Sequence, residues 1–212
     1  MRIINHGHAC FQIIGDDLSI VFDPYKDNSV PGLNIRRNIE ANFCYCSHSH
    51  YDHNAIEKVN LLLGEKEEIR NIAISLPHDK NNGKDRGFSI ARIFYYSDYS
   101  ICHLGDIGDV RSVINDKRFK NIDIVLCPIN GFYTISAKEA AKLQKEMNWK
   151  ILIPMHYEIE EKGIGYPDNG QINIFKSLYN KDEILEIDDF KLEMKDEYFK
   201  YKTLIFLKSD TE

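Results

Sequence analysis

Three histidines and an aspartate follow one short apolar run, and this cluster constrains the chain more than any other feature. Residues 43–46 have the composition of a buried strand and lead directly into His48-x-His50-x-Asp52-His53. In an extended strand end, residues two apart face the same way, so His48, His50 and Asp52 converge on one point while His53 turns aside. Imidazole and carboxylate groups together suit Zn²⁺, Fe²⁺ or Mn²⁺. The cluster predicts a metal site at a strand end, with a polar loop that is rich in histidine as the alternative.

Four residues cannot fill two metal sites, so further ligands are expected at the ends of other strands. Three polar residues follow other apolar runs at a distance of two positions, namely His78 after 72–76, Asp106 after 101–104 and His156 after 151–154. Each of them alone is typical of an ordinary surface or core polar group. Together with the first cluster, they indicate that distant segments of the chain meet at one metal centre.

Short apolar runs separated by polar turns continue along the whole chain. Strands are expected at residues 2–4, 10–14, 18–22, 43–46, 72–76, 88–96, 100–104, 123–126, 151–154, 184–187 and 204–207. Helices are expected at 55–63, 136–147 and 171–179, and Ser136 with Glu139 predicts a capping box for the second. No linker-like or low-complexity stretch interrupts this order, so residues 1–212 are expected to form a single domain.

The charge balance disfavours some classes of partner. The 212 residues include 27 Lys and Arg against 33 Asp and Glu, a formal net charge of -6. Proteins that bind nucleic acids or anionic membranes gain most of their affinity from clustered Lys and Arg, so neither partner is expected. The first residues lack the layout of a signal peptide, and no apolar run approaches the about 20 residues that span a bilayer. A cytoplasmic location is the default expectation.

The order of the motifs resembles the metallo-β-lactamase superfamily, in particular its small single-domain metal-dependent hydrolases, which include the L-ascorbate-6-phosphate lactonase group. The resemblance is carried by Gly7-His8-Ala9-Cys10-Phe11, Phe22-Asp23-Pro24, His48 to His53, His78, Gly105-Asp106, Pro128-Ile129-Asn130-Gly131 and Pro154-Met155-His156-Tyr157. It implies an α/β fold, a four-layer αββα sandwich in which two mixed sheets face each other and the metals lie at one edge. The stretch after about residue 172 carries no motif of the family.

The resemblance also implies a set of ligands. One metal would be held by His48, His50 and His78, the other by Asp52, His53 and His156, with Asp106 bridging both. Asp23 would accept a hydrogen bond from a ligand imidazole, and His8 would lie close to the site. The cofactors expected are two divalent metal ions, with zinc favoured and manganese or iron as alternatives.

These assignments imply a hydrolase in which a hydroxide shared by the two ions attacks the substrate. Two divalent ions about 3.5–4 Å apart lower the pKa of a shared water toward about 7. The small positive charge of such a centre favours a small, anionic or carbonyl-bearing substrate, which we expect to be an ester, a lactone or a phosphorylated metabolite. Asp106 and Asp52 are the expected catalytic residues, and Asp52 could also orient the hydroxide or pass a proton to the leaving group.

Other functions stay open at this point. A phosphodiesterase or nuclease, like the tRNA 3′-processing members of the superfamily, is disfavoured by the net charge and by the lack of a basic arm. A redox di-iron protein is disfavoured because Ser49 and Tyr51 stand where such sites use Glu, and because the chain leaves no room for a flavin domain. A non-catalytic metal-binding protein is the third alternative, since a fold does not establish an activity.

Charged and aromatic residues near the expected ligands are candidates for the substrate pocket. The basic candidates are Lys80, Lys84, Arg86, Arg36 and Arg37, which either bind a phosphate or carboxylate or lie on solvated loops. The aromatic candidates are Phe132, Tyr133 and Tyr157, which either wall the pocket or pack elsewhere. The loops at 27–38 and 158–170 lie beside the site in this scheme, and the second is a candidate lid.

Overall fold

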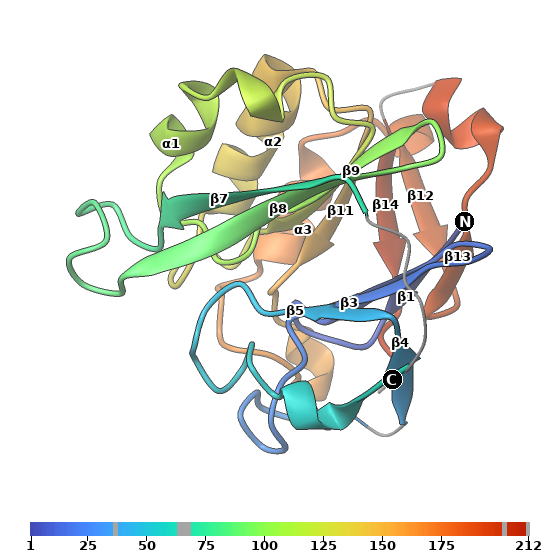
Figure 1. Ribbon diagram of the computed structural model, residues 1–212. Helices are drawn as coiled ribbons and strands as arrows, with labels where there is room; N and C mark the ends of the chain where they lie inside the picture. Colours follow the sequence, from blue (N-terminus) through green and yellow to red (C-terminus); the bar gives the residue numbers. More distant parts are fainter. Residues whose placement is uncertain (36–37, 63–68, 201–202, 211–212) are drawn as a thin grey trace.

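Two β-sheets face each other at the centre of the molecule (Figure 1). The computed structural model describes residues 1–35, 38–62, 69–200 and 203–210. The first sheet has five strands in the order β13-β1-β2-β3-β5, with β1 at Arg2–Asn5, β2 at Phe11–Ile14, β3 at Ser19–Phe22, β5 at Phe43–Tyr45 and β13 at Lys191–Glu193. The second has seven in the order β12-β14-β11-β10-β9-β8-β7, with β7 at Asn71–Pro77, β8 at Phe88–Tyr96, β9 at Tyr99–His103, β10 at Ile124–Pro128, β11 at Ile151–Met155, β12 at Ile184–Ile187 and β14 at Thr203–Leu207.

The apolar faces of the two sheets form one core. Phe22 of the first sheet stacks on Phe94 of the second, with ring centroids 5.5 Å apart. Every residue of β10 and β11 is buried, as expected for parallel strands that are covered on both faces. The apolar runs of the sequence therefore correspond to strands in the interior of a sandwich, and the expected α/β fold is confirmed.

Among the described residues, three α-helices cover the outer face of the seven-stranded sheet (Figure 1). They are α1 at Val110–Ile114, α2 at Ala137–Met147 and α3 at Gln171–Ser177. The predicted capping box of α2 is present, because the Ser136 side chain accepts a hydrogen bond from the Glu139 amide and the Glu139 carboxylate accepts one from the Ser136 amide. Ala140, Leu143 and Met147 of α2 pack into the core against the sheet. Among the described helices, none is long and apolar enough to cross a membrane.

The layer outside the five-stranded sheet is not α-helical in the residues that the structure describes. It consists of the 3-10 helix Ile56–Lys58, a two-stranded ribbon of β4 (Ile39–Ala41) and β6 (Val59–Leu61), and the loop before β4. The helix predicted at 55–63 is therefore wrong over its described part. The apolar spacing there resembles a helix, but Val59 to Leu61 pair in parallel with β4 and so take up an extended conformation.

The directions of the strands bring their carboxyl ends to one edge of the sandwich. In the first sheet β3 and β5 are parallel. In the second sheet β9, β10 and β11 are parallel, and β7 runs the same way because β8 is antiparallel to both β7 and β9. The polar residues that follow these strands therefore come from six separate segments and meet at one place.

Candidate metal centre

A buried aspartate at the end of β3 fixes the turn that follows β5. The Asp23 carboxylate accepts hydrogen bonds from the Ser47 amide at 2.6 Å and the Ser47 hydroxyl at 2.7 Å. The same carboxylate lies 2.9 Å from Nδ1 of His53. Because Nδ1 of His53 faces Asp23, its Nε2 is directed toward the other site residues, which is the arrangement expected when a carboxylate orients a ligand imidazole.

The first group of ligand atoms is formed by three histidines. Nε2 of His48 lies 2.9 Å from Nδ1 of His50, and the rings of His48 and His78 are 4.9 Å apart between centroids. The nitrogen atoms that His48, His50 and His78 offer all lie within 4.8 Å of one another. The structure thus brings the end of β7 beside the motif that follows β5.

The second group combines one carboxylate with three histidines. It consists of Asp52, His53, His156 and His8, whose ligand atoms again lie within 4.8 Å of one another. Oδ2 of Asp52 is 3.4 Å from Nε2 of His8 and 3.5 Å from Nε2 of His53. His8 stands closer to this group than the sequence indicated, since it could itself offer a ligand atom.

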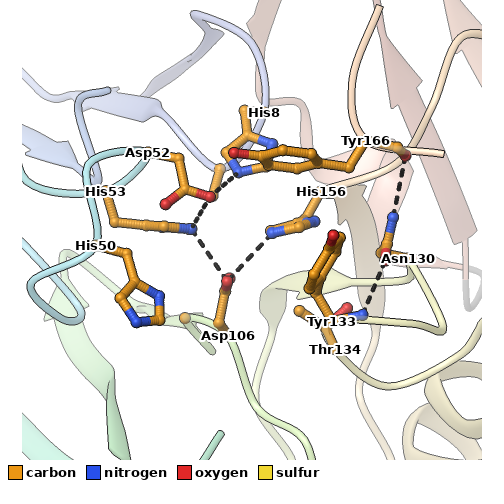
Figure 2. A network of polar contacts seen from close by, with 12 residues as sticks. His8, His50, Asp52, His53, Asp106, Asn130, Tyr133, Thr134, His156 and Tyr166 are labelled. Atoms are coloured by element: carbon orange, nitrogen blue, oxygen red, sulfur yellow. Dashed lines mark hydrogen bonds and ion pairs between the residues drawn. The ribbon is translucent and has the colours of Figure 1, made fainter. Parts of the chain in front are cut away.

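Asp106 lies between the two groups. Figure 2 shows its carboxylate facing His53 and His156, whose Nε2 atoms are 3.0 Å and 3.2 Å from Oδ2. The same oxygen is 3.6 Å from Nε2 of His78 and 4.0 Å from Nε2 of His48. One carboxylate oxygen is therefore within reach of both groups, as a bridging ligand requires.

The turn that presents Asp106 depends on the preceding glycine. Gly105 has a left-handed φ of +57°, and a Cβ at this position would lie 2.4 Å from Oγ of Ser89. The same Ser89 hydroxyl accepts a hydrogen bond from the Asp106 amide at 2.9 Å. Only glycine allows this approach, which explains the Gly-Asp pair at the end of β9.

Three of the site residues that are not glycine have a left-handed backbone. The φ angles are +56° at His8, +45° at Asp23 and +55° at His156. This conformation costs roughly 1–2 kcal/mol per residue, and such outliers cluster at functional sites. The His156 amide donates a hydrogen bond to the His8 carbonyl at 3.1 Å, which ties the turn before β2 to the end of β11.

The environment favours neutral imidazoles beside ionised carboxylates. Burial, together with the neighbouring histidines, lowers the pKa of His8 to about 3 and that of His48 to about 4. Burial alone would raise the pKa of Asp106, but the facing His156 and His53 hold it well below its usual range. The pKa of His53 is the exception, because the carboxylates of Asp106 and Asp23 outweigh burial and raise it well above its usual value.

Several buried atoms in the site lack a hydrogen bond within the described structure. They include Nε2 of His8, Nε2 of His53 and Oδ1 of Asp106. Buried polar atoms are rarely left without a partner, so such atoms around one point call for an explanation. Lone pairs of imidazole and carboxylate suit Zn²⁺, Mn²⁺ or Fe²⁺, so the residues present fit divalent ions.

A family model described as the beta-lactamase superfamily domain matches residues 2–156. The chain belongs to this superfamily. The matched range includes every residue placed in the site above, from His8 to His156. It ends one residue after β11, so the last quarter of the chain lies outside the match.

Relatives and solved structures agree with the superfamily. A UPF0173 metal-dependent hydrolase of Staphylothermus marinus is 28% identical over 195 residues, covering 74% of this chain and 84% of that protein. A UPF0173 protein of Pyrococcus abyssi is 29% identical over 187 residues, covering 74% and 83%. A crystal structure of a metallo-beta-lactamase superfamily protein from Thermotoga maritima has a TM-score of 0.71 at 24% identity and covers 99% of both chains, which shows the shared fold. The narrower resemblance to the ascorbate-6-phosphate lactonases is not confirmed by these proteins.

A cavity of about 180 Å³ opens beside the two groups of ligand atoms. It is lined by His50, Asp52, His78, Arg86, Asp106, Tyr133, His156 and Tyr166. The sequence singled out Arg86 and Tyr133 and missed Tyr166, which lies in a loop without a local pattern. Tyr166 stacks near His156 at 6.0 Å between ring centroids, and its hydroxyl donates to the Ser29 carbonyl at 2.5 Å.

The other pocket candidates lie elsewhere. Lys80 pairs with Glu139, Lys84 is exposed, and Phe132 is 71% exposed. Tyr157 lines a different cavity of about 380 Å³. Arg36 and Arg37 lie outside the described residues.

The two loops that flank the site are joined to each other. The Gly165 amide donates to the Pro31 carbonyl at 2.9 Å, close to the bond between Tyr166 and Ser29. The described part of 27–38 and the loop 158–170 therefore form one wall of the site, with Tyr166 beside His8 and above His156 (Figure 2).

Proposed function

We propose that the protein is a metal-dependent hydrolase that holds two divalent ions and cleaves a small ester, lactone or phosphorylated metabolite. The observation that carries the proposal is the position of Asp106, whose Oδ2 lies within 4.0 Å of one histidine from the first group and 3.0 Å of another from the second. The relatives that are named metal-dependent hydrolases support the same activity. We infer that residues 1–212 act as one domain.

In this proposal the two groups hold one ion each. His48, His50 and His78 would hold the first, Asp52, His53 and His156 would hold the second, and Asp106 would be a ligand of both. Bound divalent ions supply an acidified water and polarise the oxygen of the scissile group. Asp23 holds the imidazole of His53 in place, and His8 supports Asp52 from 3.4 Å.

The volume of the cavity beside the site indicates that the substrate is small. A cavity of about 180 Å³ is smaller than the roughly 300–1,000 Å³ of pockets for drug-sized ligands. Tyr133 and Tyr166 line it beside His156, and His50 and Asp52 lie across from them (Figure 2). A second cavity of about 480 Å³ adjoins it and shares His50, Asp52 and Tyr166. The net charge of -6 favours a small molecule over a nucleic-acid substrate in this proposal.

The test begins with elemental analysis of protein purified without added metal. We expect two ions per chain, zinc above manganese or iron, and hydrolysis of at least one class in a panel of esters, lactones and phosphodiesters after reconstitution with each ion. Asp106→Asn should lose metal and turnover together, whereas Asp98→Asn, at the exposed turn between β8 and β9, should keep both. Two retained ions without turnover on the whole panel would instead indicate a non-catalytic metal-binding protein.

The role of Asp52 is tested separately. Asp52 borders the cavity and contacts His8 and His53, so it can orient the attacking water or pass a proton to the leaving group. We expect Asp52→Asn to lower kcat about 10²–10⁴-fold, the usual contribution of a positioned acid or base. A variant that keeps both ions and normal turnover would show that Asp52 has no catalytic role.

A further inference from the structure

One permanent cation borders the cavity beside the histidines. Among the described residues that line it, Arg86 is the one Lys or Arg, and the carboxylates there belong to Asp52 and Asp106. The proposed function assigns both carboxylates to metal ions. The guanidinium of Arg86 lies over the ring of Tyr133, 4.5 Å from its centroid, and no carboxylate of the described residues forms an ion pair with it. Its positive charge is therefore available to a molecule in the cavity.

The loop that carries Arg86 is fixed by one set of hydrogen bonds to the side chain of Asp79. The Asp79 carboxylate accepts from the amides of Asn81 at 2.8 Å, Gly83 at 2.9 Å, Asp85 at 3.0 Å and Arg86 at 2.8 Å. The next residue, Gly87, accepts a hydrogen bond from the amide of His78 at 3.0 Å. These bonds fix the position of the Arg86 backbone relative to His78, an expected metal ligand.

The aromatic side of the pocket is held just as firmly. The Asn130 side chain accepts from the Tyr133 amide at 3.0 Å and donates to the Tyr166 carbonyl at 3.2 Å (Figure 2). The rings of Tyr133 and Tyr166 are in edge contact at 5.3 Å between centroids. A guanidinium stacked on a ring in this position loses little conformational freedom when a ligand binds to it.

We propose that Arg86 anchors a carboxylate group of the substrate, so that the preferred substrate is a small ester or lactone that carries a free carboxylate a few bonds from the scissile carbonyl. This inference rests on the proposed function of the same site. The planar guanidinium offers two parallel donors that match a carboxylate. The small cavity keeps the anchor and the histidines within the length of one small molecule.

The single cation favours a carboxylate over a phosphate. A phosphate group carries close to two negative charges at neutral pH and three strong acceptor oxygens, which one guanidinium cannot satisfy. The described cavity lining contains no second Lys or Arg that could bind the other charge of a phosphate. A monoanion matches the charge that Arg86 supplies.

The test compares methyl hydrogen succinate with its neutral amide, methyl succinamate, on the metal-loaded full chain, with acid release followed in a pH-stat. Arg86→Gln should raise KM for the carboxylate ester about 10- to 100-fold, because a hydrogen bond to a charged group contributes about 1.5–3 kcal/mol. KM for methyl succinamate should change less than about threefold. Arg86→Lys should have a higher affinity than Arg86→Gln and a lower one than the parent, since lysine keeps the charge but lacks the two parallel N–H donors of the guanidinium.

The matched control is Lys84→Gln, which removes the same charge from an exposed residue of the same loop and should leave both substrates unchanged. Equal KM values for the parent and Arg86→Gln on methyl hydrogen succinate would overturn the anchor and leave the hydrolase intact. The carboxylate anchor would also be overturned if Arg86→Gln weakened the binding of inorganic phosphate but left KM for methyl hydrogen succinate unchanged.

A binding measurement separates the anchor from the proposed function. Succinamate has the carboxylate and lacks an ester, so its affinity for the metal-loaded protein can be measured by calorimetry without turnover. Weaker binding to Arg86→Gln would support the anchor even if no ester in the panel is hydrolysed, a result that would defeat the hydrolase alone. Equal binding to both proteins would mean that the metals hold the carboxylate, and the anchor would be wrong.

Discussion

Asp23 is the residue on which the orientation of His53 depends. Its carboxylate is fully buried and accepts hydrogen bonds from the Ser47 amide and hydroxyl, while it faces Nδ1 of His53. Burial alone would raise the pKa of Asp23, but the facing His53 and His103 and these hydrogen bonds bring it below its usual value. The group is therefore a carboxylate that positions an imidazole.

We expect Asp23→Ala to weaken metal binding about 10–100-fold, the usual effect of removing the partner of a ligand histidine. Metal affinity is measured by competition with a chelator, beside a control, Asp16→Ala, at an exposed turn. The metal affinity of Asp23→Asn should lie between those of Asp23→Ala and the Asp16→Ala control, since asparagine keeps an acceptor but loses the charge. An unchanged affinity in Asp23→Ala would show that His53 is held by other contacts.

The residues that the sequence could identify are those with a local signature. His48, His50, Asp52 and His53 follow one strand closely, so the sequence alone predicts a site there. Their grouping differs from the strand spacing, because the segment forms bends and a turn: Asp52 joins His53, and not His48 and His50. Tyr166 has no such signature, because it enters the site only through the bond between its loop and Ser29. A contact between segments 137 residues apart cannot be inferred from the pattern of either one.

The elements were predictable where hydrophobic periodicity and tertiary pairing agree. Strand β10 and helix α2 have unambiguous patterns, and both lie where the sequence placed them. Residues 55–63 have apolar spacing that fits a helix, yet β6 forms because β4 offers an open edge. Strand β4 itself and the short helix α1 were missed, since three to five residues give too little periodicity.

The capping box at the start of α2 predicts a measurable contribution to stability. Ser136→Ala removes the acceptor for the Glu139 amide and leaves that donor without its partner. We expect a loss of about 0.5–2 kcal/mol in the free energy of unfolding, measured by urea denaturation. Ser136→Thr keeps the hydroxyl and should recover most of this loss. A full loss in both variants would mean that packing around Ser136, rather than the cap, is responsible.

At the amino end of β10, opposite the site, the carboxylate of Asp123 contributes a stability that depends on pH. Asp123 accepts hydrogen bonds from the Ser100 amide at 2.9 Å and hydroxyl at 2.7 Å, and it pairs with Lys150 at 2.6 Å. Burial would raise the pKa of Asp123, but Lys150 and Ser100 bring it below the ordinary value of 3.8. A carboxyl whose folded pKa is lowered stabilises the fold above its unfolded pKa.

Asp123→Asn should therefore destabilise the protein by about 1–2 kcal/mol at pH 7, where the whole contribution is present. The difference from the parent should shrink as the pH falls below 3.8 and vanish once it passes the folded pKa, because the parent loses the charge as well. Denaturant unfolding at several pH values measures this. Asp188→Asn, in an ion pair whose carboxylate is 87% exposed, is the control and should have little effect. A difference that persists unchanged at low pH would mean that the charge of Asp123 is not its cause.

At the scale of the whole molecule, the site joins the two sheets. Asp23 and the residues from His48 to His53 come from the five-stranded sheet, whereas His78, Asp106 and His156 come from the seven-stranded one. The backbone bond from His156 to His8 crosses between the sheets at the same edge. Ions bound here would hold the two halves of the sandwich together, and the unfolded chain would bind them far less tightly.

Removal of the metal should therefore destabilise the entire fold rather than the site alone. At a free metal concentration of 100 times Kd, binding adds about 2.7 kcal/mol. For a chain of this length a chelator should then lower Tm by about 5–10 °C, as followed by calorimetry. Asp106→Ala is the control, because the loss of the carboxylate that we propose as a shared ligand should make Tm nearly insensitive to chelator. Equal Tm values for metal-loaded and chelated parent protein would show that the ions do not couple the two sheets, because binding that spans both sheets must be lost when they separate.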